Sequence, residues 1–256
     1  MTEKHLTDTR FDSFGLSDQI IAGVRDAGFE YCRPIQAGTL PLALQGHDVA
    51  GQAQTGTGKT AAFALPILSR IDVNRLAPQV LVLAPTRELA IQVAEAFQKY
   101  ASFMKGFHVM PIYGGQDYKI QIRQLQRGVH VVVGTPGRVM DHMRRGTLKL
   151  DALQALVLDE ADRMFDLGFI KDIRYLLRRM PPPEQRLNLL FSATLSHRVS
   201  ELAYEHMNAP IVVNAAGPWA GAVSELAGLS IPLIPLRRQW LTTTSLPELP
   251  PDFPFV

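Results

Sequence analysis

The sequence predicts an α/β fold in which a parallel sheet carries helices on both faces. Short apolar runs alternate along the 256-residue chain with longer stretches in which apolar residues recur at helical spacing. Most of the short runs are apolar at consecutive positions, as expected for strands that are buried on both faces of a parallel sheet. The repeated strand–helix order indicates a doubly wound layer structure, whose ligands bind at the carboxyl ends of the strands.

Seven apolar runs are predicted strands, with helical stretches between them. The strands are expected at residues 48–53, 80–84, 107–112, 129–133, 155–158, 187–191 and 211–213. One helix is expected over residues 87–103, because Leu89, Val93, Phe97 and Tyr100 recur three or four positions apart and would form one apolar face.

The character of the sequence changes after residue 214. Residues 215–256 are rich in proline, contain both tryptophans and show no period of a strand or a helix. We therefore assign residues 1–214 to one domain and expect an irregular, disordered C-terminal tail at residues 215–256.

Composition limits the class of protein. With 46% hydrophobic and 20% charged residues, the chain resembles an ordinary soluble protein, and its net charge of +2 neither indicates nor excludes a nucleic-acid partner. Cys32 is the only cysteine, which excludes an intrachain disulfide or a thiolate zinc site and fits a reducing compartment. Neither a signal peptide nor an apolar run of the roughly 20 residues that span a membrane is found. We expect a cytoplasmic protein without membrane contact.

A glycine-rich segment lies between the first predicted strand and a helix that is expected to begin near Thr60. Its residues are Ala53, Gln54, Thr55, Gly56, Thr57, Gly58, Lys59 and Thr60. Gly56 and Gly58 permit positive-φ turns that point backbone amides at phosphates, and the helix N-terminus adds partial positive charge. Lys59 can reach the β- and γ-phosphates, and the Thr60 hydroxyl can bind Mg²⁺. An unspecialised glycine-rich turn is disfavoured by the flanking strand and helix, so we expect a site for a nucleoside triphosphate.

A second motif follows the predicted strand at residues 155–158. It reads Asp159, Glu160, Ala161 and Asp162. A carboxylate at the end of a strand beside the phosphate loop can hold Mg²⁺ through a water molecule, which suits Asp159. Glu160 can then orient or deprotonate the attacking water. We therefore predict Lys59, Asp159 and Glu160 as catalytic residues.

The acidic motif and the glycine-rich segment together resemble the DEAD-box RNA helicases, whose first domain has a RecA-like P-loop NTPase fold. The adenine-reading motif of that family matches residues 28–36, and Phe11 lies upstream at the separation that the family uses for an isolated aromatic residue. The resemblance implies that Gln36 hydrogen-bonds the adenine edge and that Phe11 packs near the base, which would select ATP.

Three further segments resemble the contacts that this family makes with the sugar–phosphate backbone of single-stranded RNA. They are Pro85, Thr86 and Arg87, then Gly114 and Gly115, then Thr135, Pro136, Gly137 and Arg138. Each follows a predicted strand and offers backbone amides, a hydroxyl or a guanidinium to phosphate oxygens. The resemblance implies that single-stranded or structured RNA is bound through its backbone, with little preference for sequence.

A segment that couples the two sites is also implied. Ser192, Ala193 and Thr194 follow a predicted strand, where the family links nucleotide state to RNA binding, and we expect Ser192 and Thr194 to hydrogen-bond Asp162.

Residues 162–174 and 178–182 look most like the bacterial RNA helicase B branch of the family, which is associated with the RNA degradosome. The resemblance therefore implies a monomeric ATP-dependent RNA helicase, which couples ATP hydrolysis to local unwinding and has degradosome components as partners.

Two departures from the family pattern bear on activity. Arg33 stands where the adenine-reading motif usually has threonine or serine, so nucleotide affinity is expected to differ from the family norm. The family also has a second domain that carries arginine fingers, and residues 215–256 show none of its motifs. We expect a truncated chain that binds ATP and Mg²⁺, hydrolyses ATP slowly and does not unwind duplexes.

One hypothesis explains the tail as a frameshift. Residues 229–234 can be encoded so that another reading frame gives Phe-Tyr-Pro-Ser-Asp, a run that the resemblance leads us to expect at this point.

Two other functions remain open. One is a catalytically impaired module that binds nucleotide, RNA or a partner protein without turnover. The other is a P-loop ATPase that acts on something other than nucleic acid, such as a transporter subunit, and the ordered presence of Gln36 and the RNA-type segments argues against it.

Overall fold

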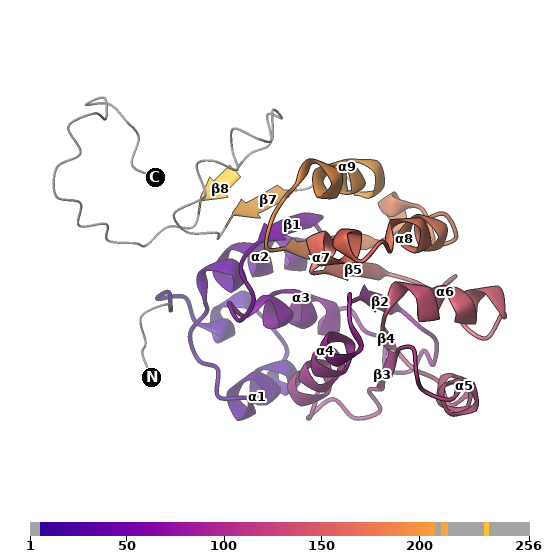
Figure 1. The fold of residues 1–256 in the computed structure, drawn as a ribbon. Helices are drawn as coiled ribbons and strands as arrows, with labels where there is room; N and C mark the ends of the chain where they lie inside the picture. Colours follow the sequence, from indigo (N-terminus) through magenta and orange to yellow (C-terminus); the bar gives the residue numbers. More distant parts are fainter. Residues whose placement is uncertain (1–5, 208–210, 215–232, 236–256) are drawn as a thin grey trace.

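An eight-stranded sheet, parallel at every pairing, forms the centre of the described part of the chain (Figure 1). The computed structural model describes residues 6–207, 211–214 and 233–235. The strand order is β3-β4-β2-β5-β6-β1-β7-β8. The strands are β1 Val49–Gln52, β2 Val80–Leu83, β3 Val109–Ile112, β4 Val131–Gly134, β5 Ala155–Asp159, β6 Leu187–Ser192, β7 Ile211–Asn214 and β8 Leu233–Pro235.

All seven predicted strands are present, and their ends differ from the prediction by at most two residues. β5 and β6 are each longer by one residue than the apolar runs indicated. Asp159 pairs with Phe191 in the β5–β6 ladder, and Gln52 pairs with Ser192 in the β1–β6 ladder. The pairing between neighbouring strands therefore includes the polar residue that ends each of β1, β5 and β6.

β8 lies within the segment for which we expected no regular structure. It pairs with β7, with Val213 opposite Ile234. Three residues are too few to show a period in the sequence, and Pro235, which lacks an amide hydrogen, is tolerated in an edge strand. The rest of the predicted tail lies outside the described residues.

The helices that connect the strands are α1 Asp18–Asp26, α2 Pro34–Gln45, α3 Lys59–Leu68, α4 Arg87–Tyr100, α5 Tyr118–Gln126, α6 Pro136–Arg144, α7 Ala161–Asp166, α8 Ile170–Leu177 and α9 His197–His206, with short 3₁₀ helices η1 Phe11–Phe14 and η2 Pro183–Gln185. The predicted helix over residues 87–103 is α4, which ends earlier because Ala101 leaves the helical conformation. In the described part of the chain, none of these helices combines the length and the apolar character that crossing a membrane requires.

Two apolar cores, one on each face of the sheet, confirm the predicted layer structure. α1 to α4 pack on one face and α6 to α9 pack on the other (Figure 1). Successive residues of β2 point in opposite directions, so that Val80 and Val82 join the first core and Leu81 and Leu83 join the second. This burial on both faces explains why the strands read as continuous apolar runs.

Phe63 of α3 is an anchor of the first core, and its removal should destabilise the domain. Its ring is fully buried, with centroids 6.1 Å from Phe97 of α4 and 5.4 Å from Phe191 of β6. We expect Phe63→Ala to lower the free energy of unfolding, measured by urea denaturation, by about 3–5 kcal/mol. The matched control Phe103→Ala removes a ring that is 50% exposed and should change the free energy by roughly 0.5 kcal/mol or less. Equal effects of the two changes would contradict this account of the core.

Candidate nucleotide and nucleic-acid site

The candidate site lies at the carboxyl ends of three neighbouring strands, β1, β6 and β5. The glycine-rich loop follows β1, the first acidic residue closes β5, and Ser192 closes β6. Because every strand runs in the same direction, these ends meet at one edge of the sheet. The structure therefore brings together the two motifs that the sequence analysis assigned to phosphate and Mg²⁺.

The glycine-rich loop has the predicted backbone geometry. Gly56 and Gly58 have φ angles of 82° and 90°, in the left-handed region that glycine occupies at little cost. α3 begins at Lys59, one residue before the predicted start, with Gly58 as its N-cap. A Cβ atom at Gly58 would collide with the side-chain nitrogen of Gln36, so the close approach of these two residues also requires glycine.

Lys59 and Asp159 are both buried in the site and interact electrostatically. The Lys59 side chain is almost buried, and its Nζ donates a hydrogen bond to Ala53 O at 2.9 Å. Asp159 is also buried, and burial raises its pKa to about 6, while the Lys59 ammonium lowers the same pKa. A buried carboxylate of this kind gains from a nearby cation, so the donor set of Asp159 and the Thr60 hydroxyl fits Mg²⁺.

Glu160 adopts a strained conformation at the start of α7. Its φ of 51° is the only positive value among the described non-glycine residues, and such a conformation costs roughly 1–3 kcal/mol. Its carboxylate accepts a hydrogen bond from Thr55 Oγ1 at 3.3 Å and pairs with Arg163 at 3.1 Å. The backbone strain thus aims the predicted catalytic carboxylate at the phosphate loop.

The adenine-type motif is bonded to the phosphate loop. The Gln36 carboxamide accepts a hydrogen bond from Arg33 N at 2.7 Å and donates one to Gly58 O at 3.0 Å. The Arg33 guanidinium donates a further hydrogen bond to Gly56 O at 2.7 Å. Arg33 stands where the adenine-reading motif usually has threonine or serine, and it hydrogen-bonds the glycine-rich loop directly. The sequence did not indicate this contact.

Phe11 lies in the first core, beside the adenine-type motif. Its side chain is buried, with its ring centroid 6.2 Å from that of Phe29.

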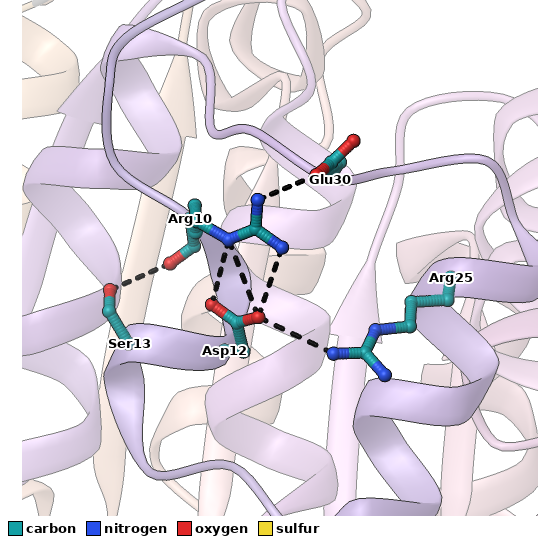
Figure 2. A network of polar contacts seen from close by, with 5 residues as sticks. All are labelled: Arg10, Asp12, Ser13, Arg25 and Glu30. Atoms are coloured by element: carbon teal, nitrogen blue, oxygen red, sulfur yellow. Dashed lines mark hydrogen bonds and ion pairs between the residues drawn. The ribbon is translucent and has the colours of Figure 1, made fainter.

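A network of ion pairs holds the short helix η1, which carries Phe11, against α1 and the loop after it (Figure 2). Arg10 pairs with Glu30 at 2.6 Å and with Asp12 at 3.3 Å, and Asp12 also pairs with Arg25 at 3.4 Å. All four side chains are substantially exposed, so each pair contributes little on its own, and the network chiefly fixes the position of η1.

The three RNA-type segments follow β2, β3 and β4, which are neighbours in the sheet. Thr86 caps α4 by accepting a hydrogen bond from Leu89 N at 3.2 Å, and Pro136 opens α6. The Arg87 guanidinium lies 5.1 Å from the centroid of the Tyr113 ring, just before Gly114. Because β2 also pairs with β5, the RNA-type segments lie at the same edge as the nucleotide site.

Arg138, in the third of these segments, contacts the loop that contains Gly114 and Gly115. It donates hydrogen bonds to Gln116 O at 2.9 Å and to Gln121 Oε1 at 3.1 Å. The sequence analysis did not identify Gln121. The sequence contains one local indication of a polar contact here, because Arg138, His142 and Arg145 recur at helical spacing and would share one face of a helix.

The expected hydrogen bonds between the acidic motif and the segment after β6 are present. Asp162 Oδ2 accepts hydrogen bonds from both the amide and the hydroxyl of Thr194, each at 3.0 Å, and Asp162 N donates to Ser192 Oγ at 3.2 Å. Gln52 at the end of β1 adds a contact that was not predicted, because its amide donates to Ala193 O at 3.2 Å.

Comparison with known proteins identifies relatives in sequence and in structure. The family model described as DEAD/DEAH box helicase matches residues 33–202. A protein from Shewanella sediminis named ATP-dependent RNA helicase RhlB is 51% identical over 84% of this chain and 51% of its own length. One of the same name from Xanthomonas oryzae pv. oryzae is 55% identical over 82% of this chain and 38% of its own length. The chain thus spans about half, or less, of the length of these curated relatives.

A solved structure agrees with these sequence matches. The crystal structure of a DEAD box protein from the hyperthermophile Methanococcus jannaschii superposes with a TM-score of 0.76 at 39% sequence identity, over 80% of this chain and 56% of that one. With the phosphate loop, the acidic motif and the RNA-type segments at one edge of such a sheet, the chain belongs to the DEAD/DEAH box helicase family.

Proposed function

We propose that this chain is the ATP-binding and RNA-contacting part of an ATP-dependent RNA helicase. The observation that carries the proposal is the shared edge of the sheet, where the phosphate loop and the acidic motif lie beside three segments suited to a nucleic-acid backbone. The relatives from Shewanella and Xanthomonas, which are named ATP-dependent RNA helicases, support it. Local unwinding is proposed for the whole helicase rather than for residues 1–256.

ATP binding would use the loop and the motif that is bonded to it. The amides of residues 54–60 and the Lys59 ammonium would bind the phosphates, since Lys59 Nζ has three donors and uses one of them on Ala53 O. Gln36 would turn its carboxamide to the adenine edge, and Phe11 would support the base through Phe29. Mg²⁺, held by Thr60 and Asp159, would neutralise charge on the phosphates.

Hydrolysis would depend on Glu160, which would orient the attacking water. Its carboxylate accepts hydrogen bonds from Thr55 and Arg163, and both contacts occupy part of its acceptor capacity while they persist. Arg33 donates to Gly56 O, and Arg163 pairs with Glu160. We propose that turnover by residues 1–256 is slow, because these two guanidinium groups are engaged in other contacts and phosphoryl transfer is accelerated by an arginine that stabilises the charge of the transition state.

RNA would be bound through its sugar–phosphate backbone. Arg87 and Arg138 offer guanidinium groups, and the loops at Gly114 and Thr135 offer backbone amides, so little sequence preference is expected. Asp162 is hydrogen-bonded to Ser192 and Thr194, and a change in these bonds when nucleotide binds would alter the RNA-type surface. We further propose a monomeric protein of the cytoplasm that has components of an RNA degradosome as partners.

Two alternatives predict different results. A catalytically impaired module would bind nucleotide and RNA without turnover, and the engaged state of Glu160 favours it for this chain. A P-loop ATPase that acts on something other than nucleic acid would bind ATP without any response to RNA.

The first test is ATP hydrolysis by the purified chain, with and without single-stranded RNA, beside fluorescent-nucleotide binding. We expect nucleotide binding with slow turnover, and Glu160→Gln should remove the turnover while leaving nucleotide affinity within about twofold. Rapid RNA-stimulated turnover would refute the proposal of slow hydrolysis. Failure to bind nucleotide would refute the proposed function itself.

The Mg²⁺ site can be tested without turnover. The unmodified chain should bind ATP more tightly with Mg²⁺ than with EDTA, and Asp159→Asn should abolish that difference, because a carboxamide is a weaker ligand than a carboxylate. Asp166→Asn, at an exposed position at the end of α7, is the matched control and should keep the difference. If both variants respond to Mg²⁺ equally, Asp159 does not hold the metal.

The link from Arg33 to the loop should oppose nucleotide binding, because it stabilises the loop while Lys59 is bonded to Ala53. A hydrogen bond of this kind contributes about 0.5–1.5 kcal/mol, so Arg33→Thr should tighten ATP binding about 2- to 10-fold. Arg75→Ala, which removes an exposed arginine elsewhere, should have no effect on titrations with fluorescent nucleotide. Weaker binding by Arg33→Thr would show that Arg33 instead supports the nucleotide-bound loop.

A further inference from the structure

A fully buried polar cluster lies between α5 and α6, next to the proposed RNA surface. Gln121 of α5 and His142 of α6 have no exposed surface, and neither lies in a segment that the sequence analysis assigned to RNA. Burying a carboxamide and an imidazole in a core costs free energy unless every polar atom finds a partner. The arrangement of those partners shows what the cluster does.

The Gln121 carboxamide is bonded on both sides. Its Nε2 donates to Tyr113 O at 3.0 Å and to Gln116 Oε1 at 2.8 Å, which hold both ends of the loop that carries Gly114 and Gly115. Its Oε1 accepts from Arg138 NH1 at 3.1 Å and from His142 Nε2 at 2.8 Å. One side chain therefore joins two of the three RNA-type segments.

His142 holds Gln121 in this orientation. Burial, together with the positive charges of Arg138 and Arg145, lowers the pKa of His142 to about 4, so the ring is neutral near pH 7. A neutral imidazole has one N–H, and this must be at Nε2 to donate to Gln121 Oε1. Nδ1 is then the acceptor for the Thr147 hydroxyl at 2.8 Å, whose single hydrogen is shared with His142 O at 3.1 Å.

The aromatic ring of Tyr118 forms the other side of the Arg138 environment. The guanidinium carbons of Arg138 and Arg145 each lie 4.1 Å from its centroid, within the range of a cation–π contact. The Tyr118 hydroxyl donates to Asp141 Oδ2 at 2.8 Å, so a carboxylate offsets part of the positive charge gathered here. Arg138 is thus fixed between a carboxamide and a ring before any ligand arrives.

We infer that Gln121, held by His142, is a positioning residue for Arg138. It fixes the guanidinium in the orientation that binds RNA phosphate, and it joins the loop at Gly114 to α6 as one rigid unit. This inference rests on the proposed contact of Arg138 with RNA. An arginine that is fixed in advance loses less side-chain entropy when phosphate binds, which strengthens RNA binding. A purely structural role of Gln121 would stabilise the fold without affecting the contribution of Arg138.

The test compares Gln121→Met, which keeps the side-chain volume and removes all four hydrogen bonds, with Gln124→Met at an exposed position of the same helix. Binding of fluorescein-labelled oligouridylate by the full chain is measured as anisotropy over a series of salt concentrations. We expect Gln121→Met to weaken binding about 3- to 10-fold, because the freed guanidinium must be ordered again when phosphate binds. The variant keeps the Arg138 charge, so most of the slope of log affinity against log salt should remain, whereas Arg138→Gln should reduce that slope by about 0.7, the value for one lost phosphate contact on a single strand. Gln124→Met should change neither the affinity nor the slope.

Two further measurements separate positioning from a structural role. Gln121→Met combined with Arg138→Gln should bind RNA no more weakly than Arg138→Gln alone, because Gln121 acts through Arg138. Additive losses of affinity would overturn the inference. If the unmodified chain binds no RNA, the contact of Arg138 with RNA fails, and the inference fails with it.

NMR relaxation of the Arg138 side-chain Nε–H group tests the positioning without RNA. The group should be ordered in the unmodified chain and mobile in Gln121→Met. If that variant does not fold, Tyr118→Leu at a half-buried position removes the ring contact and should also mobilise Arg138. An Arg138 side chain that stays ordered in the folded variant would overturn the inference even if RNA binding is intact.

Discussion

The parallel direction of the sheet, buried on both faces, is the constraint on which the remaining features depend. Strands that are covered on both sides carry mostly apolar side chains, so polar residues are concentrated at the ends of the strands. Gln52, Asp159 and Ser192 occupy this place at the ends of β1, β5 and β6. Because these three strands are neighbours, their polar ends form one site without any long-range rearrangement of the chain.

The same constraint explains how the nucleotide site is connected to the RNA-type surface. Glu160 and Asp162 belong to one turn after β5, and Asp162 is bonded to the segment after β6 through Ser192 and Thr194. A shift of the backbone at Glu160 would therefore alter the hydrogen bonds that hold the end of β6. The strain at Glu160, whose φ is 51°, makes this turn a place where a small change in contacts can change the conformation.

Local features of the site could be predicted from the sequence, whereas contacts between elements could not. The phosphate loop was recognisable because its glycines and Lys59 are consecutive, and α4 because Leu89, Val93 and Phe97 share one helical face. Gln121 gave no such signal, since its role depends on how α5 packs against α6. The Arg33 contact likewise depends on the distance between two loops that are far apart in the chain. β8 was missed because three residues show no period.

Three cations of the candidate site differ from the paired arginines near η1 in the oxygens to which they donate. Lys59, Arg33 and Arg138 donate to neutral oxygens, which are backbone carbonyls and one carboxamide. Arg10 and Arg25, in contrast, are paired with carboxylates at the surface (Figure 2). A neutral acceptor orients a cation without cancelling its charge, and a phosphate oxygen forms a stronger charge-assisted bond that can displace it. The free energy lost with the neutral partner is therefore recovered when phosphate binds. Exchange of a carboxylate for a phosphate would change the free energy little, because both partners are anions.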